Sequence, residues 1–325
     1  MANLMVTTAC TMRCPFCFAG PATGERNENS SPHIRLENFE DHLAFLSRSG
    51  IAQVRLIGGE PTLHPRFPEL IERARGRHIV VFTGGLIPER SLTCLEELAE
   101  SECTVIVNMN ATRHPDGPSH NETRRRSAVV KRLQGRALLG FTISHVDFVL
   151  EPILDLIAAT GARREIRLGL AQPVLGGSNK YLHPKLYASV GRRLTEFALR
   201  AAAEHVRLEF DCGFVRCMFS EEDLAALKAI GTDVGWRCNP VLDVGVDGTV
   251  SHCFPLAGHI DLQLFPHHDA GQLRGALEAK TRPYRQAGIY PACSGCEFKH
   301  EGECTGGCLA LTMSRFRDRT VGVGL

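Results

Sequence analysis

The chain lacks several features that mark specialised classes of protein. Lys and Arg number 37 against 36 Asp and Glu, so the net charge of +1 gives no basis for a nucleic-acid or polybasic membrane surface. No apolar run reaches about 18 residues, so no membrane span is predicted. Residues 1–6 lack the basic and apolar segments of a signal peptide, which makes the cytoplasm the expected compartment. Internal repeats and low-complexity tracts are also missing.

The remaining composition is that of an ordinary globular protein, apart from its cysteines. Hydrophobic residues make up 43% and charged residues 22% of 325 residues, a length that indicates about two domains. The 13 cysteines, about 4% of the chain, are too few for a small disulfide scaffold. In a reducing compartment, clustered thiols favour metal or redox chemistry.

Short apolar segments alternate with helix-like segments over the first half of the chain. The segments are rich in Val, Ile and Leu, as strands buried on both faces should be. Six strands in about 170 residues predict parallel βα units, in an open partial barrel or a doubly wound sheet, because a closed eight-stranded barrel needs about 250 residues. The predicted strands are Leu4–Thr8, Gln53–Ile57, His78–Thr83, Thr104–Asn108, Ala137–Thr142 and Glu165–Leu170.

The pattern changes after Leu170. A loop at 172–178 precedes a predicted helix at 185–204, and a further helix begins at Ser220 with Asp223 in a capping-box arrangement. Beyond it, cysteines are dense from 212 to 308. The basic run that ends at Arg126 is expected to be a solvated loop or helix face, with substrate contact as a minor alternative.

Three cysteines follow the first predicted strand in a C-x3-C-x2-C pattern: Cys10, Cys14 and Cys17. Ligands bind at the carboxyl ends of parallel strands, where this segment lies. Three thiolates can hold three irons of a [4Fe–4S] cluster and leave the fourth iron open to a small molecule. Zinc is an alternative, but it needs a fourth ligand, and the nearest histidine is His33. A role without metal is the third possibility.

Two motifs together resemble the radical S-adenosylmethionine (radical SAM) enzyme family. The first is the cysteine segment 10–17, with an aromatic residue directly before Cys17. The second is Gly58-Gly59-Glu60-Pro61, the "GGEP" segment, at the end of the second predicted strand. The resemblance covers residues 1 to about 170 and implies a partial (βα)6 barrel, in agreement with the strand count.

The resemblance also implies cofactors and a reaction. Cys10, Cys14 and Cys17 would ligate the [4Fe–4S] cluster, and its open iron would chelate S-adenosylmethionine. The backbone of Gly58 and Gly59, with Glu60, would receive the methionine ammonium group. Reductive cleavage would release a 5′-deoxyadenosyl radical that takes a hydrogen atom from the substrate, with an electron donor such as flavodoxin or ferredoxin.

Further cofactor contacts are expected at the ends of later strands. Thr83-Gly84-Gly85 stands where relatives often have Thr-Asn-Gly, so the central asparagine is missing. Cys94 and Cys103 are interpreted as small buried apolar residues. The candidates for cofactor binding, each of which could instead be a capping or packing residue, are Gly58, Gly59, Glu60, Pro61, Asn108, Ser144 and Arg167.

Eight cysteines remain, the number needed for two [4Fe–4S] clusters with four ligands each. An Asp247-Gly248 turn signal lies between Cys238 and Cys253, so a hairpin is expected to bring these two cysteines together. A glycine-rich C-x2-C-x7-C-x3-C segment follows. The candidate metal ligands of this group are Cys212, Cys217, Cys238, Cys253, Cys293, Cys296, Cys304 and Cys308.

This pattern is similar to the SPASM extension of radical SAM enzymes, which carries auxiliary iron–sulfur clusters. Seven residues separate Cys296 from Cys304 where the family usually has five, and no cysteine follows Cys308. Cys212 and Cys217 could substitute, or one cluster could be missing or open. The resemblance implies a core at 1–175, a helical linker at 176–235 and an auxiliary cluster domain at 236–325. By the same resemblance, Cys238, Cys253 and Cys308 would share one cluster with an upstream cysteine, and Cys293, Cys296 and Cys304 would hold the other. A smaller "twitch" version with one cluster on Cys238, Cys253, Cys293 and Cys296 also fits, as does structural zinc on the last four cysteines.

The resemblance leaves three functions open. The favoured one is oxidative modification of a peptide or protein side chain by cross-linking, dehydrogenation or epimerisation. The second is oxidation or rearrangement of a small metabolite such as a sugar alcohol, since no room is seen before Leu4 for a separate peptide-recognition domain. The third is a metal-binding interaction protein without catalysis. No catalytic acid or base is assigned, because His64, His145 and Glu165 are expected to be surface or capping residues.

Overall fold

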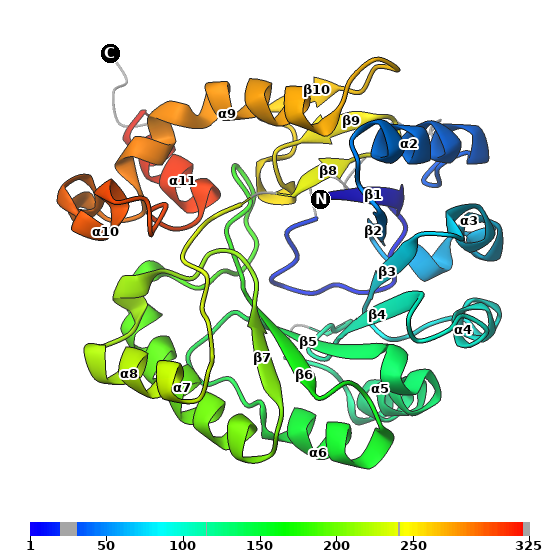
Figure 1. Ribbon diagram of the computed structural model, residues 1–325, viewed down its shortest axis with the longest axis horizontal. Coiled ribbons are helices and arrows are strands. Elements are labelled where there is room, and N and C mark those ends of the chain that lie inside the picture. Colours follow the sequence, from blue (N-terminus) through cyan, green and yellow to red (C-terminus); the bar gives the residue numbers. More distant parts are fainter. Residues whose placement is uncertain (20–30, 115, 240, 321–325) are drawn as a thin grey trace.

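The computed structural model describes residues 1–19, 31–114, 116–239 and 241–320, and its strands form one ten-stranded sheet. The strand order is β10-β9-β8-β1-β2-β3-β4-β5-β6-β7, so the sheet has two free edges and does not close (Figure 1). The strands are β1 (Ala2–Thr7), β2 (Gln53–Gly58), β3 (His78–Thr83), β4 (Cys103–Asn108), β5 (Ala137–Ile143), β6 (Glu165–Leu170), β7 (Arg207–Phe210), β8 (Leu242–Val244), β9 (Thr249–Ser251) and β10 (Asp261–Gln263).

The six predicted strands are confirmed as β1–β6, each within one or two residues of its expected bounds. Neighbouring strands from β1 to β7 pair in parallel, and this curved sheet is the partial barrel that the sequence predicts. β7 is an addition, because it lies within the segment predicted as a helical linker and pairs in parallel with β6.

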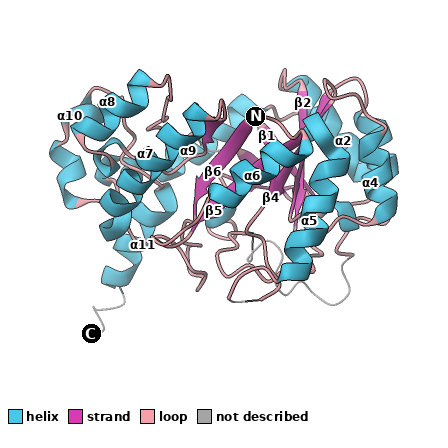
Figure 2. Ribbon diagram, turned by 90° about the horizontal axis from the view of Figure 1, so that it is seen from below, coloured by secondary structure: helices cyan, strands magenta, loops and turns pink. Residues whose placement is uncertain are grey.

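Helices α2–α6 cover the outer side of the sheet, α7 packs against β7, and α9 lies along β10 (Figures 1 and 2). The long helix predicted at 185–204 and the capping box of Ser220 with Asp223 are both present. The helices are α2 (Leu36–Arg48), α3 (Phe67–Ala74), α4 (Glu89–Glu96), α5 (His120–Leu133), α6 (Glu151–Thr160), α7 (Tyr187–Ala203), α8 (Glu221–Ala229), α9 (Ala270–Ala287), α10 (Glu297–His300) and α11 (Leu309–Thr320).

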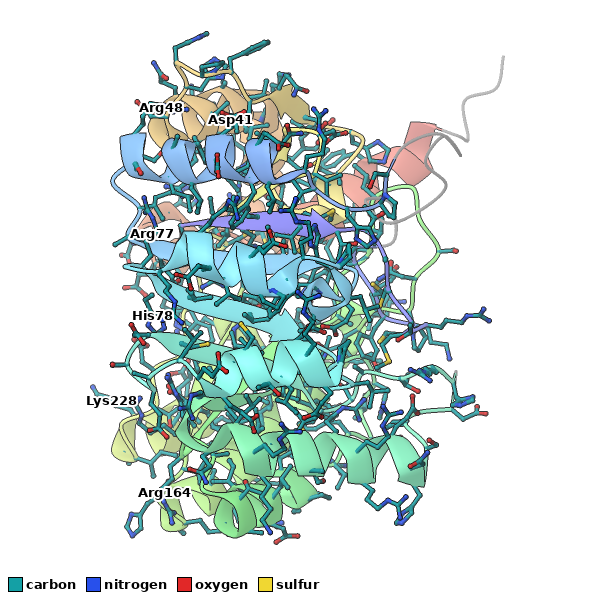
Figure 3. All side chains as sticks on the ribbon, turned by 90° about the vertical axis from the view of Figure 1, so that its right-hand side faces the viewer. Asp41, Arg48, Arg77, His78, Arg164 and Lys228 are labelled. Atoms are coloured by element: carbon teal, nitrogen blue, oxygen red, sulfur yellow. The ribbon has the colours of Figure 1, made fainter. Side chains whose placement is uncertain are left out.

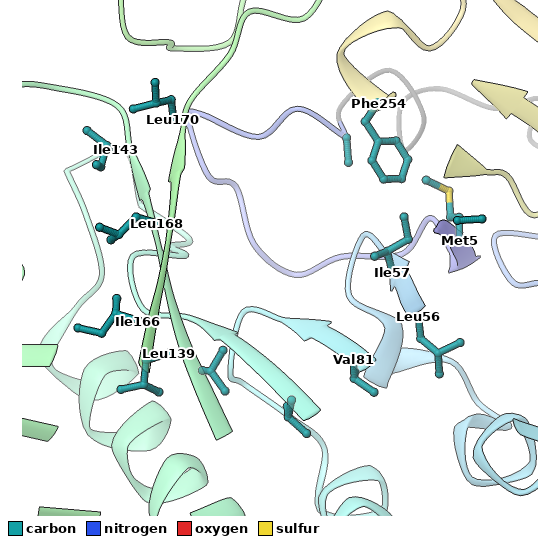
Figure 4. Close-up of a cluster of buried hydrophobic side chains, with 14 of the residues drawn as sticks. Met5, Leu56, Ile57, Val81, Leu139, Ile143, Ile166, Leu168, Leu170 and Phe254 are labelled. Atoms are coloured by element: carbon teal, nitrogen blue, oxygen red, sulfur yellow. The ribbon is translucent and has the colours of Figure 1, made fainter. Parts of the chain in front are cut away.

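The main core lies between the sheet and its outer helices. Phe39 and Phe45 on α2 and Leu56 on β2 are fully buried there. Figure 4 shows how successive strands contribute apolar side chains, such as Leu56, Val81 and Leu139. Burying such side chains contributes about 1.5–3 kcal/mol each, which keeps the sheet and the loops at its edge in a fixed arrangement.

The predicted C-terminal hairpin is confirmed as β8 and β9, which pair antiparallel across the Asp247-Gly248 turn. Gly248 has a φ of +80°, a conformation that favours glycine. β8 also pairs in parallel with β1, so the hairpin extends the barrel sheet. The cysteine-rich segment is therefore held against the first strand of the barrel.

Most candidate cofactor residues of the barrel lie at the carboxyl ends of the strands, but Arg167 lies within β6, three residues before its end. Figure 3 places Arg77, His78 and Arg164 along the edge where β3 and β6 begin. The carboxyl ends of the parallel strands, and the loops that follow them, lie at the other edge. Within the described part of the chain, no helix is long and apolar enough to cross a membrane.

Candidate cofactor site at the carboxyl ends of the strands

The structure brings the three N-terminal cysteines together on the loop after β1. The N–H of Cys17 donates to the carbonyl oxygen of Cys14 at 3.0 Å, so these two residues share one tight turn of the loop. The backbone N–H of Thr112, on the loop after β4, donates to Cys14 Sγ at 3.3 Å. The N–H of Met12 donates to Cys10 Sγ at 3.3 Å. Backbone donors therefore already point at two of the sulfur atoms that would carry negative charge as ligands.

Burial makes the thiols of Cys10 and Cys14 harder to deprotonate. Burial raises the pKa of Cys14 to about 11, although the hydrogen bond from Thr112 opposes this rise. Burial also raises the pKa of Cys10. Metal binding replaces the proton and so stabilises the thiolate. Among the described residues, no three His, Cys, Asp or Glu side chains converge on a site for a single ion. A [4Fe–4S] cluster is larger and bonds each thiolate to a different iron.

Gly58 and Gly59 allow the loop after β2 to lie directly on the cysteine loop. A Cβ atom at Gly58 would come within 2.2 Å of the carbonyl oxygen of Thr7, and one at Gly59 within 2.4 Å of that of Ala9. The N–H groups of Gly59 and Glu60 donate to these same two oxygens at 2.9 and 2.8 Å. Only glycine fits at both positions, which places the "GGEP" backbone beside the cluster-binding segment.

Glu60 is buried and accepts hydrogen bonds from within the protein. Its Oε1 accepts from the Thr62 hydroxyl at 2.6 Å and the Thr62 N–H at 3.3 Å. Its Oε2 accepts from the Thr83 hydroxyl at 2.9 Å and the Gly84 N–H at 2.8 Å. Burial raises the pKa of this carboxyl group, and the four donors oppose the rise. The side chain thus joins the loops after β2 and β3. Pro61 begins the short 3-10 helix Pro61–Leu63 that follows.

Of the other candidate cofactor residues, Asn108 and Ser144 lie at strand ends, whereas Arg167 lies within β6. Asn108 ends β4, and its Oδ1 is buried with no partner among the described residues. Asn110 is already engaged, since it bonds both backbone groups of Thr142. Ser144 is half-buried directly after β5. Arg167 donates from Nη2 to Asp211 Oδ2 at 2.6 Å.

Arg126 differs from the sequence expectation. The basic run was expected to lie on a solvated face, but the side chain of Arg126 is fully buried. Its guanidinium group donates to the carbonyl oxygens of Gly84 at 2.8 Å, Met109 at 3.3 Å and Ala111 at 2.7 Å. The loops after β3 and β4 leave carbonyl groups without β partners, and one arginine satisfies three of them.

The eight C-terminal cysteines lie between the end of β7 and the start of α11. Cys212 lies within electrostatic range of Cys238, Cys253 and Cys308. Cys217 lies within electrostatic range of Cys293, Cys296 and Cys304. Burial raises the pKa of Cys308 to about 12 and that of Cys217 to about 11, and neighbouring thiols add to both shifts. Cys238 and Cys253 lie on the two sides of the β8–β9 hairpin, as the sequence predicts.

Several other residues have the local roles that the sequence predicts. Cys103 is buried at the start of β4, and Cys94 is half-buried in α4. His64 bonds the carbonyl oxygen of Ile34 and the N–H of Arg66. Glu165 pairs with Arg207, and His145 is exposed.

A charged interior was not foreseen. Arg55 on β2 and Arg167 on β6 both lie over the ring of Phe82 on β3, at 4.9 and 5.2 Å from its centroid. Asp211 pairs with Arg167, and Asp243 on β8 is fully buried with a pKa raised by burial to about 7. The sequence signal that could have predicted this charged interior is the presence of Arg55, Arg167 and Asp243 within otherwise apolar strands.

Comparison with known proteins supports one family. Residues 4–135 match the Radical SAM superfamily. A GTP 3′,8-cyclase of Chlorobaculum tepidum is 30% identical over 99 residues, 29% of this chain and 28% of that protein. The alignments with the first curated relatives span about a third or less of those proteins. The mycofactocin maturase MftC of Mycobacterium ulcerans is 24% identical over 94% of this chain and 81% of its own length.

Solved structures with this fold include two enzymes with bound S-adenosylmethionine. SuiB of Streptococcus suis superposes with a TM-score of 0.67 and 16% identity, over 95% of this chain and 73% of SuiB. The enzyme anSMEcpe superposes with a TM-score of 0.66 and 16% identity, over 94% and 88% of the two chains. The chain therefore carries a radical SAM domain, in the partial-barrel fold of the SPASM-type radical SAM enzymes, and its cofactors are a [4Fe–4S] cluster and S-adenosylmethionine, with further cysteines present for auxiliary clusters.

Proposed function

We propose that this chain is an enzyme that oxidatively modifies a side chain of a peptide or protein. The cluster, when bound, supplies the electron that cleaves S-adenosylmethionine to a 5′-deoxyadenosyl radical, which removes a hydrogen atom from the substrate. Removal of one further electron and a proton then completes an oxidation. The auxiliary clusters provide a class of one-electron acceptor for that purpose.

The roles of individual residues follow from the site. Cys10, Cys14 and Cys17 hold the first cluster. The backbone of Gly58 and Gly59 receives the amino group of S-adenosylmethionine, and Glu60 with Pro61 fixes that backbone. The unpartnered Oδ1 of Asn108 is positioned to accept a hydrogen bond from the cofactor.

Similarity along the whole chain favours a peptide over a small metabolite. The segments shared with the nucleotide-converting relatives cover only about a third of this chain. MftC, named as a maturase, matches 94% of the chain, cysteine-rich region included. SuiB and anSMEcpe, which share the fold, have been solved with bound peptides. This whole-chain match is the observation that carries the proposal.

The charged interior is consistent with a polar group of the substrate. Arg167 and Asp211 neutralise each other, and Arg55 and the buried Asp243 lie in the same part of the barrel. A substrate side chain with hydrogen-bonding groups can exchange partners there without leaving a buried charge unpaired. Ser144 follows β5 at the same end and is a further candidate contact.

The first experiment measures 5′-deoxyadenosine after anaerobic reconstitution, with a flavodoxin or ferredoxin system, or dithionite, as electron donor. Wild type and Cys94→Ala should produce it, whereas Cys14→Ala should not. Formation of 5′-deoxyadenosine by Cys14→Ala would contradict the assigned cluster site. A cytoplasmic location, where such reductants occur, belongs to the same proposal.

The second experiment addresses the substrate class. A library of short synthetic peptides and a panel containing GTP and a sugar alcohol are incubated separately with the reduced enzyme. We expect peptides that have lost the mass of two hydrogen atoms, or that have exchanged one hydrogen with solvent. If a metabolite of the panel is converted and every peptide stays unchanged, the substrate is a small molecule and the proposed peptide substrate is wrong.

A further inference from the structure

Two arginines occupy the barrel interior, on the face of the sheet away from the outer helices. Arg55 on β2 pairs in register with Val80 on β3, and Val80 belongs to a small buried cluster that is separate from the main core. Arg167 precedes Leu168 on β6, whose side chain lies in the main core, so the arginine faces the other way. Both guanidinium groups lie over the ring of Phe82 and therefore approach the same part of the interior.

The two arginines differ in their partners. Arg167 forms an ion pair with Asp211. Arg55 is half-buried, and no carboxylate of the described chain lies within ion-pair distance of it. Its Nε donates to Asn3 Oδ1 at 2.9 Å and its Nη1 to Gln53 Oε1 at 3.3 Å, and both of these acceptors are neutral amides. A cation that has lost part of its hydration is stabilised by an anion, which Arg55 has not found nearby.

The remaining carboxylates of the interior are bound by other donors or hydrated. Asp243 accepts hydrogen bonds from Asn3 Nδ2 at 2.7 Å and from the Phe254 N–H at 2.6 Å. The Asn3 amide thus lies between Asp243 and Arg55. Glu209 on β7 is exposed and keeps its hydration. These carboxylates attract Arg55 only from a longer distance, which leaves its guanidinium group free to take an anion as a direct partner.

Two glycines leave room beside Arg167. Gly140 on β5 pairs in register with Arg167, and Gly169 lies two residues further along β6 on the same face. Neither has the positive φ that requires glycine. The nearest described atom to an added Cβ would lie at 3.4 Å for Gly140 and 3.8 Å for Gly169, which are ordinary contact distances. Glycine weakens a strand, and its use where the backbone does not need it is typical of a place that a ligand approaches closely.

This space adjoins the cofactor site. Asn108, whose Oδ1 has no partner among the described residues, pairs in register with Gly140. Gly140 in turn pairs with Arg167. A substrate group held beside Arg167 therefore lies in the same row of the sheet as a proposed contact of S-adenosylmethionine.

We propose that Arg55 and Arg167 bind a carboxylate group of the peptide substrate inside the barrel, in the room left by Gly140 and Gly169. This inference rests on the proposed function, because the carboxylate belongs to the peptide. A guanidinium group offers paired N–H donors that match a carboxylate, and it keeps them while its face stacks on an aromatic ring. An Asp or Glu side chain and the C-terminus of a peptide present the same group, and the first test separates these two sources.

The first test compares three forms of each peptide that wild type converts. They are the parent peptide, its C-terminal amide, and a form with Asn and Gln in place of Asp and Glu. At least one replacement should raise the KM about tenfold or more, and it identifies the source of the carboxylate. Arg55→Gln should lose this preference, whereas Arg192→Gln, at an exposed position on α7, should keep it. Equal KM values of wild type for all three forms would overturn the inference.

Gly169→Ala tests the space without removing a charge. Alanine fits the backbone here, so the urea midpoint should equal or exceed that of wild type. The KM for the parent peptide should rise about tenfold, because one extra methyl group fills part of the space. Binding of S-adenosylmethionine, measured by equilibrium dialysis, should stay unchanged. Gly275→Ala on α9, where a Cβ would also meet no described atom, is the matched control. An unchanged KM would overturn the inference, and so would weaker binding of S-adenosylmethionine, since the space would then belong to the cofactor.

Failure of the proposed function gives a different result. If reduced wild type cleaves S-adenosylmethionine but converts no peptide, the peptide assignment is wrong. The carboxylate site is then tested by modification of wild type with phenylglyoxal, which reacts with accessible arginine side chains. Acetylglycine should protect Arg55, and acetylglycine amide should not. Equal modification of Arg55 in the presence of either compound would refute the carboxylate site.

Discussion

The ring of Phe18 stacks on that of Phe254 with centroids 5.8 Å apart and an angle of 30° between their planes. Phe18 directly follows Cys17 and Phe254 directly follows Cys253, so the contact joins the loop after β1 to the segment after β9. Phe254 is buried and its N–H donates to Asp243 Oδ2 at 2.6 Å, whereas Phe18 is exposed. The pair therefore fixes the relative position of two cofactor-binding loops at the barrel edge.

Replacing Phe254 by Ala should separate cleavage of S-adenosylmethionine from product formation. The stacked contact contributes about 0.5–1.5 kcal/mol, and a displacement of about 1 Å between reacting groups can lower a rate about 100-fold. We expect unchanged iron content, retained 5′-deoxyadenosine formation and much less modified substrate. The measurement is the ratio of modified substrate to 5′-deoxyadenosine. Phe265→Ala, at an exposed ring away from this contact, should keep the wild-type ratio.

The carboxylate of Glu60 should not tolerate an amide. In Glu60→Gln, one acceptor oxygen becomes an NH2 group that faces backbone or hydroxyl donors from Thr62 or Gly84. A buried donor without an acceptor costs about 1–3 kcal/mol. We expect a lower urea midpoint and weaker binding of S-adenosylmethionine, measured by equilibrium dialysis. Glu69→Gln is the control, since its ion pair with Arg66 is exposed and contributes at most about 1 kcal/mol. Equal effects of the two variants would contradict this role.

The strands and the first cysteine site could be predicted because their signals are local. Strands buried on both faces are continuous apolar runs, and the C-x3-C-x2-C and GGEP segments are short. β7 was missed because its four residues, Arg207–Phe210, include two charges and lie at the edge of the sheet. The burial of Arg126 depends on carbonyl groups of the loops after β3 and β4, and no spacing rule in the sequence contains those contacts.

Arg126→Lys should destabilise the protein although it keeps the charge. Three carbonyl oxygens share the guanidinium group, and a lysine ammonium cannot match its planar arrangement of donors. Each carbonyl left without a donor costs about 1–3 kcal/mol. We expect a lower urea midpoint and weaker binding of the first cluster, because the loop that carries Thr112 contacts Cys14.

Arg125→Lys is the matched control for this prediction. The two arginines are neighbours on α5, but Arg125 is exposed. Its replacement should change the free energy of unfolding by less than about 0.5 kcal/mol. A midpoint for Arg126→Lys equal to that of Arg125→Lys would mean that the three carbonyl groups find other donors.

Because His42 is buried, we expect the free energy of unfolding to fall in weak acid. The side chain is buried on α2 and its Nδ1 has no hydrogen-bond partner among the described residues. Burial lowers its pKa to about 4, against an ordinary value of 6.5, although Asp41 and Asp247 oppose this shift. The folded state therefore holds neutral His42 between these two pH values, while the unfolded chain takes up a proton.

The sign follows from that difference in bound protons. The contribution of neutral His42 is fully present above pH 6.5 and is lost as the pH falls through the folded pKa. The difference between a pKa of 6.5 in the unfolded chain and about 4 in the folded protein corresponds to about 3 kcal/mol at most. The urea midpoint of His42→Leu should thus fall less between pH 7.5 and pH 5 than that of wild type, with both proteins in the same cofactor state. His145→Asn, at an exposed position, should follow wild type. If the urea midpoint of His42→Leu falls as much as that of wild type over this interval, groups other than His42 cause the loss of stability in acid.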